Sequence, residues 1–241
     1  MVEAIRRAPY AGLVVAAVSA SWFGLRWFTP WVQRVTGFAD RVTDPDLQQI
    51  LGHWVFWQLP AVVLCAVVWA AGQRFGLLPR FTALFGAGGS WRRVLTAGAA
   101  ASVVLLAATL AIGAAAGGRF GFHPYAPKMV GDLASNLYEE FVNRGLVFCA
   151  LYGVVAARPF GLARDPTFEA TRLHRAAILV ATVGSCALFA AGHGQYPVPL
   201  RVVLGVLSVA FVWPFVVARS LWAPWIPHTV VDVIADSILV L

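Results

Sequence analysis

The sequence predicts an all-α protein, a polytopic bundle of about seven (six to eight) transmembrane helices. Of its 241 residues, 60% are hydrophobic and only 12% are charged, and the mean hydropathy is +0.75. A soluble domain carries about 25% charged residues. Because so few charges cannot cover a globule with polar surface, we expect a single integral-membrane domain over residues 1–241.

Seven apolar stretches are long enough to cross a membrane, since about 30 Å of hydrocarbon requires roughly 20 helical residues. They lie at 8–28, 51–71, 94–117, 133–156, 175–193, 198–218 and 221–241. The first has a basic start and small residues near Ala20, as a cleavable signal peptide does. Its apolar run continues beyond Ala20, which favours a retained helix, with removal of residues 1–20 as the alternative.

Arginine is concentrated in every second polar segment. Arg6 and Arg7 precede the first stretch, four arginines lie in 72–93, and four lie in 157–175. The positive-inside rule therefore predicts a cytoplasmic N-terminus and an opposite C-terminus in a plasma or inner membrane. The net charge of +7 is attributed to this orientation, so membrane lipid, and not nucleic acid, is the expected partner.

The three cysteines, Cys65, Cys149 and Cys186, each lie within an apolar stretch. They show neither CxxC spacing nor a mixed cysteine–histidine pattern. We therefore expect them to be small packing residues and not disulfide or zinc ligands.

A few ionisable residues fall inside the predicted spans, where charge is costly and marks pairing or chemistry. They are Glu139, Glu140 and Arg144 in the fourth stretch, His193 at the end of the fifth, and His228 and Asp232 in the seventh. Other groups are expected to be peripheral: Asp236 near the last boundary, His53 at an interface, and His123 and His174 in solvated loops.

Four-residue spacings place these groups on shared helix faces. Glu140 and Arg144 stand in the favourable acid-first order for an ion pair, which leaves Glu139 as the free carboxylate. Glu139 shares a face with Asn143 in turn. His228 and Asp232 repeat the spacing, so the carboxylate can orient the imidazole.

Phe189 and His193 have the same spacing in the fifth stretch. The predicted directions of the spans bring Glu139, His193 and His228 together in the outer half of the bundle, provided that the three helices are neighbours. For each group alone, a structural role is the competing interpretation, since an intramembrane histidine can simply bind across helices.

Taken in order, the motifs are EExxxR (Glu139, Glu140, Arg144), FxxxH (Phe189, His193) and HxxxD (His228, Asp232), the last preceded by "SLWAPWIPH". This series resembles the CPBP, or ABI, family of intramembrane proteases, which includes type II CAAX-prenyl endopeptidases and bacteriocin self-immunity proteins. The resemblance implies a catalytic core over residues 130–241. Asp232 stands where that family often has asparagine, so this position either donates no hydrogen bond or donates only when protonated.

The resemblance implies hydrolysis of a peptide bond in a membrane-associated or prenylated protein or peptide. Glu139 would act as the general base on a water that His193 also holds, and His228 and Asp232 would stabilise the oxyanion. Glu140 and Arg144 would support the helix. No cofactor is the favoured expectation, and the alternative is a zinc ion bound by Glu139, His193, His228 and Asp232.

Two further functional classes remain open. A non-catalytic scaffold or immunity protein would keep the same polar core for folding or partner binding. A proton-coupled transporter would use the glutamate and histidines as a relay, although no inverted repeat is visible. The sequence identifies neither the substrate nor the oligomeric state.

Overall fold

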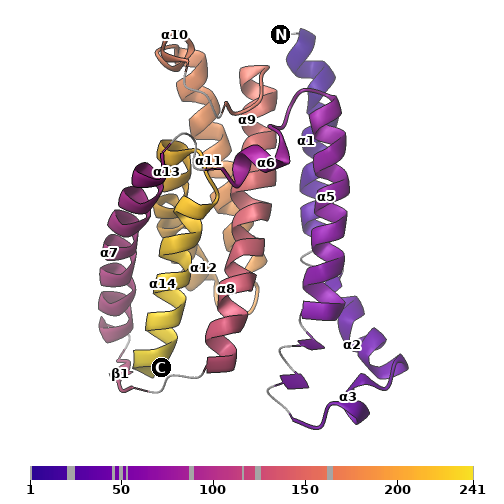
Figure 1. Ribbon diagram of the computed structural model, residues 1–241, viewed down its shortest axis with the longest axis vertical. Helices are drawn as coiled ribbons and strands as arrows, with labels where there is room; N and C mark the ends of the chain where they lie inside the picture. The colour runs from indigo at the N-terminus through magenta and orange to yellow at the C-terminus, as the bar shows by residue number, and fades with distance from the viewer. Residues whose placement is uncertain are drawn as a thin grey trace.

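The computed structural model describes residues 2–20, 25–44, 47–48, 51–52, 54–86, 90–115, 117–122, 126–161 and 165–240. These residues form an elongated bundle of helices, in agreement with the predicted all-α class (Figure 1). The strands that are described, β1 (Arg119–Phe120) and β2 (Leu239–Val240), pair antiparallel and join the chain after α7 to the end of α14.

The N-terminal half supplies α1 (Val2–Ser19), α2 (Leu25–Val35), α3 (Phe38–Arg41), the π-helical η2 (Trp54–Gln58), α5 (Leu59–Arg74), α6 (Phe81–Leu84) and α7 (Trp91–Ala115). α5 continues η2 without a break, and Pro60 lies in its first turn. Proline has no N–H to donate to the preceding turn, and the Phe56 carbonyl there accepts a hydrogen bond of 3.2 Å from the Thr29 hydroxyl. α1 and α5 stand side by side at one flank of the bundle (Figure 1).

The C-terminal half begins with one continuous rod, formed by α8 (Ala126–Glu140), the π-helical η3 (Phe141–Phe148) and α9 (Cys149–Ala156). It is followed by α10 (Pro166–Glu169), α11 (Arg172–Gly192), α12 (Val198–Leu207), α13 (Val209–Ala218) and α14 (Trp222–Ile238). α14 packs against both α7 and α8, and α11 packs against η3 and α9. The three segments expected to carry the site are therefore close neighbours.

Among the residues that the structure describes, four helices have the length and apolar composition of a membrane span: Trp54–Arg74, Trp91–Ala115, Arg172–Gly192 and Val198–Ala218. They correspond to the second, third, fifth and sixth predicted stretches. The predicted count of about seven is not confirmed. Helices also occur in the other three stretches, but α1 holds three charged residues, the rod from α8 to α9 holds Glu139, Glu140 and Arg144, and α14 has only 17 residues.

The core lies where α1, α5, η3, α9, α11 and α13 meet. Large aromatic side chains fill it, with Phe148 in edge contact with both Phe160 and Phe215. Gly153 lets α9 approach the chain after α5, since a Cβ there would stand 2.5 Å from the Leu77 carbonyl oxygen. The three cysteines are buried and free, as expected for packing residues.

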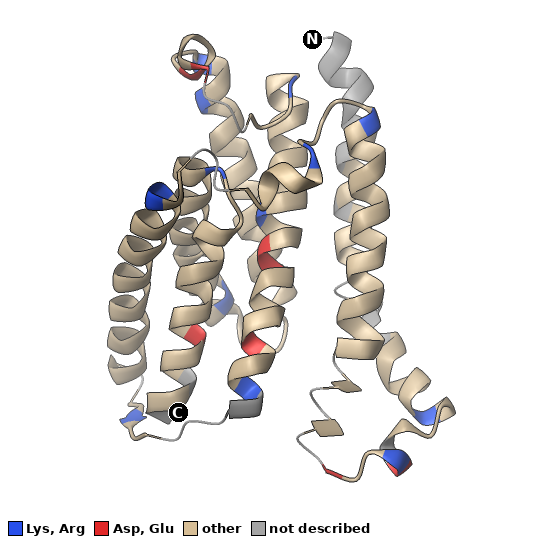
Figure 2. Ribbon diagram, viewed as in Figure 1, with Lys and Arg blue, Asp and Glu red and all other residues tan. Residues whose placement is uncertain are grey.

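The basic loops share one end of the bundle. Figure 2 shows the arginines of the α5–α7 connection and those around α10 at the end where α1 begins. α14 ends at the opposite end, beside β1 (Figure 1). The predictions for His53 and His123 concern residues outside the described part of the chain, as does the side chain of Asp236.

Candidate active site

His228 on α14 lies at the centre of the polar groups in the bundle. Its Nδ1 is 2.7 Å from Glu140 Oε1. On the other side of the ring, Nε2 is 3.8 Å from Glu139 Oε2 and 3.7 Å from Asp232 Oδ2. One imidazole is therefore surrounded by three carboxylates from two helices, and its Nε2 is too far from either neighbouring oxygen for a direct hydrogen bond.

Glu140 and Arg144 are the fully buried ion pair of this cluster. Arg144 Nη1 donates to Glu140 Oε1 at 3.2 Å, and both side chains are completely buried. Arg144 Nη2 also donates to the Ser208 carbonyl at 3.1 Å, and its guanidinium lies 5.1 Å from the Phe189 ring centre. The expected pair is present, but its carboxylate also contacts His228, which the spacing alone did not indicate.

Glu139 is the carboxylate without a counter-ion on its own helix. Its Oε2 is buried and has no hydrogen-bond partner, although the side chain as a whole is 23% exposed. Asn143 does not bind this carboxylate, because its Nδ2 donates to the Glu139 backbone carbonyl at 2.8 Å. The Asn143 amide instead satisfies a backbone carbonyl where the rod changes from α- to π-helix. Short π-helical segments are frequent at functional sites.

His193 follows the last residue of α11, and its ring packs against the Phe189 ring, as the ring of His228 also does. Its Nδ1 is 2.8 Å from the Phe189 carbonyl oxygen, so Nδ1–H donates to that carbonyl and Nε2 is the nitrogen open to another partner. The Phe189 ring centre is 4.4 Å from that of His193 and 5.8 Å from that of His228. Phe189 thus contacts both imidazoles.

The predicted alternative is a zinc ion bound by Glu139, His193, His228 and Asp232. Among the described residues, no group of three or more histidine, cysteine, aspartate or glutamate side chains is placed to hold a metal ion. His228 Nδ1 is bound to Glu140, so Nε2 is the ring nitrogen open to a ligand, and it lies 3.8 Å from Glu139 Oε2 and 3.7 Å from Asp232 Oδ2. The choice between zinc and no metal stays a prediction.

Several neighbours of the site were not identified from the sequence. Ser208 and Phe211, which lie at and after the α12–α13 junction, contact Arg144 and His228, and Phe211 stacks on His228 with ring centres 4.6 Å apart. Asp132 and Asn136 lie on α8 one to two turns before the glutamates. Asp132 is seven residues before Glu139 and Asn136 is four residues before Glu140, and these helical spacings could have indicated both residues from the sequence.

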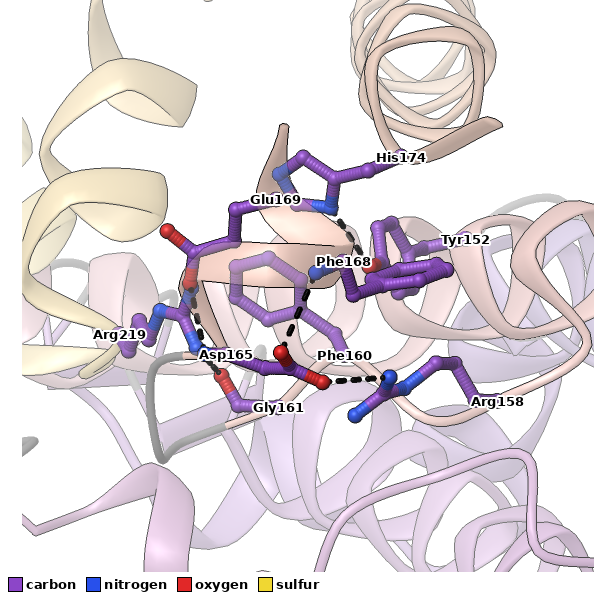
Figure 3. Close-up of a pocket in the computed structure, with 9 residues that line it drawn as sticks. All are labelled: Tyr152, Arg158, Phe160, Gly161, Asp165, Phe168, Glu169, His174 and Arg219. Carbon is purple, nitrogen blue, oxygen red and sulfur yellow. Dashed lines mark hydrogen bonds and ion pairs between the residues drawn. The ribbon is translucent and has the colours of Figure 1, made fainter. Parts of the chain in front are cut away.

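A second polar cluster lies at the other end of the bundle, around a pocket between α9, α10, α11 and the α13–α14 connection (Figure 3). Arg219 binds Glu169 and the Gly161 carbonyl. His174 Nδ1 is 2.8 Å from the Tyr152 hydroxyl. The expectation of a solvated loop histidine was wrong, because Thr171 caps α11 and places His174 in its first turn.

The comparisons with known proteins concern the C-terminal half. Residues 129–234 match the model of a family described as type II CAAX prenyl endopeptidase Rce1-like. This stretch runs from α8 to α14 and includes Glu139, His193, His228 and Asp232. The match confirms the resemblance for that part of the chain. No curated protein and no solved structure matches the chain.

Proposed function

We propose, from the Rce1-like character of residues 129–234, that this protein is an intramembrane endopeptidase with Glu139 as its general base. The observation that carries the proposal is the position of Glu139 Oε2, which is buried, has no hydrogen-bond partner and lies 3.8 Å from His228 Nε2. A carboxylate oxygen free of partners can accept a proton from a bound water.

In the proposed reaction, Glu139 moves one proton from the water to the leaving amine, and His228 stabilises the oxyanion. Glu139 accepts a proton from the water as the water oxygen forms a bond to the scissile carbonyl carbon. His228 carries a proton on both nitrogens, so that Nδ1 donates to Glu140 while Nε2 donates to the oxyanion. When the C–N bond breaks, Glu139 returns its proton to the leaving amine, and the products are a carboxylic acid and an amine.

The remaining residues position these groups. His193 Nε2 accepts a hydrogen bond from the same water, because Nδ1 is held by the Phe189 carbonyl. Asp232, 3.7 Å from His228 Nε2, and Glu140 favour the cationic ring between them. Arg144 pairs with Glu140 in a fully buried position and holds its carboxylate against His228. No metal ion and no cofactor enter this reaction.

The substrate is a membrane-associated or prenylated protein or peptide. His193 follows the end of α11 that is remote from the basic loops, so the site belongs to the half of the bundle opposite those loops. With the basic end in the cytoplasm, as the positive-inside rule requires, an exported or membrane-anchored peptide fits this side better than a cytoplasmic prenylated protein. Cysteine labelling of each loop from either side tests the orientation.

The test uses purified protein in lipid nanodiscs with two internally quenched peptides, one farnesylated at a CAAX end and one an unprenylated transmembrane segment. We expect cleavage of at least one peptide, and a loss of about 10²–10⁴-fold in kcat for Glu139→Gln and a large loss for His193→Ala. Asp165→Asn is the control, because this carboxylate lies in the second polar cluster at the other end of the bundle and pairs with Arg158.

Equal cleavage by wild type and Glu139→Gln would remove the proposed base. Cleavage of neither peptide would favour a non-catalytic scaffold that keeps the polar core. Activity that survives exhaustive chelation supports the metal-free reaction, and activity restored by added zinc after chelation contradicts it.

A further inference from the structure

Asn136 is a buried amide that the proposed reaction does not yet use. Its side chain is 3% exposed, and Nδ2 has no hydrogen-bond partner. A buried donor without a partner destabilises the folded protein, so such groups in native proteins need an explanation. We propose that Asn136 Nδ2 donates a hydrogen bond to the carbonyl oxygen of the scissile peptide bond, an inference that rests on the proposed function.

The neighbours of Asn136 along α8 show which way the residue faces. The carbonyl of Leu133, one turn earlier, accepts a hydrogen bond of 2.8 Å from Trp225 Nε1 of α14. Glu140, one turn later, binds His228 Nδ1 of the same helix. Asn136 lies between these two contacts, on the strip of α8 that packs against α14. It therefore stands beside the helix that carries His228 and Asp232.

The Asn143 amide nitrogen and both terminal nitrogens of Arg144 are engaged, whereas Arg144 Nε is buried without a hydrogen-bond partner. Asn143 Nδ2 donates to the Glu139 carbonyl, and Arg144 donates to Glu140 and to the Ser208 carbonyl. The ionised carboxylates of Glu139, Glu140 and Asp232 can only accept. His228 Nε2 is then one donor to a developing oxyanion, and Asn136 Nδ2 is the amide with unused capacity on the facing helix.

The reaction requires such a donor. As water adds to the carbonyl carbon, the oxygen becomes negative beside His228 Nε2, which itself lies 3.8 Å from Glu139 Oε2 and 3.7 Å from Asp232 Oδ2. Two carboxylates so near oppose that charge, and a second donor on the α8 side offsets them. Loss of one preorganised oxyanion donor lowers kcat by about 10²–10³-fold in other hydrolases.

The experiment compares wild type with Asn136→Leu, which keeps the size and removes the donor, and with Asn136→Ala as a second donor-free variant. Each is assayed for cleavage, for thermal stability and for inhibition by two peptide analogues of the cleaved sequence. One analogue is an aldehyde, whose hydrate mimics the tetrahedral intermediate. The other is a reduced amide, which lacks the carbonyl oxygen. Ser135→Ala is the control: Ser135 is on the same helix as Asn136, and its hydroxyl accepts a hydrogen bond from Gln58 Nε2 of η2.

We expect Asn136→Leu to lower kcat and to raise the aldehyde Ki by about 100-fold each, with the reduced-amide Ki unchanged and the Tm equal or higher. Ser135→Ala should lower the Tm and leave kcat unchanged. Wild-type kcat in Asn136→Leu, an equal rise in both Ki values, or a fall in Tm that accounts for the lost activity would each overturn the inference. The Glu139→Gln variant separates the two proposals: if it is inactive while Asn136→Leu is fully active, only this inference fails.

Discussion

Two arginine–glutamate pairs, one fully buried and one partly exposed, can be compared within this molecule. Arg144 and Glu140 lie one turn apart in a single rod, and both side chains are fully buried. Arg219 and Glu169 are fifty residues apart in the sequence, and their side chains are 8% and 23% exposed. The first pair fixes a charge beside a histidine, whereas the second pair connects separate segments.

Their surroundings differ in the same sense. Beside Arg144, several buried polar atoms have no hydrogen-bond partner: Glu139 Oε2, Glu140 Oε2, Asn136 Nδ2 and Asn143 Oδ1. Beside Arg219, the charged groups bind one another or the backbone, as Arg158 does with Asp165 at 3.0 Å (Figure 3). A substrate could bind to the polar atoms without partners in the Arg144 cluster. In the Arg219 cluster, the hydrogen bonds that are already formed hold α10 against the bundle.

The largest effect on stability is expected at Arg144. Arg144→Leu removes one of the two cationic partners of the buried Glu140 carboxylate and leaves it with His228 alone, which costs about 3–5 kcal/mol of unfolding free energy. The double change Arg144→Leu/Glu140→Leu should recover much of the stability but none of the activity, because His228 loses its Nδ1 acceptor. Thermal unfolding in detergent and cleavage assays check both statements, and a single variant as stable as wild type would contradict the first.

A smaller and purely structural effect is expected at Arg219. Arg219→Leu removes the bonds to Glu169 and to the Gly161 carbonyl and should cost about 1–3 kcal/mol, since the site is partly exposed. Activity per folded molecule should remain at the wild-type value. If kcat fell without a fall in stability, the two clusters would be coupled, and the distinction between them would be lost.

The smallest effect is expected at Asp165, which caps α10 and pairs with Arg158 on the surface. The Phe168 N–H and the Arg158 guanidinium lower the pKa of this carboxyl below its usual value. A carboxyl whose pKa is lower in the folded state stabilises the fold above its unfolded pKa, and this contribution disappears as the pH falls through the folded pKa.

Asp165→Ala should therefore lower the Tm slightly at neutral pH, and the difference from wild type should shrink in acid below about pH 4. Thermal unfolding of both proteins across this range measures it. Arg158→Ala is the matched variant. A Tm difference that grows as the pH falls would show that Asp165 is not stabilised in its ionised form.

Composition and spacing were sufficient for the all-α class, for four long apolar helices and for the pairing of Glu140 with Arg144. The span count was not predictable in the same way, because two of the three stretches in question contain the polar residues of the site itself. Contacts between distant segments were also inaccessible: the Ser208 carbonyl on Arg144, the Glu140 contact with His228, and His174 beneath Tyr152 depend on how helices pack, which single-helix periodicity does not specify.

In the π-helical segment Phe141–Phe148, the number of residues matters separately from their side chains, because it sets the rotation of Glu139 and Glu140 relative to α9. Hydrogen bonding in such a segment spans five residues and not four. Deletion of one residue there would allow an ordinary α-helix, and each residue of an α-helix turns it by about 100°. Glu139 and Glu140 would then rotate away from α14 relative to α9, although every site residue was retained. Insertions and deletions within these eight residues should therefore be excluded by selection as strictly as replacement of Glu139 itself.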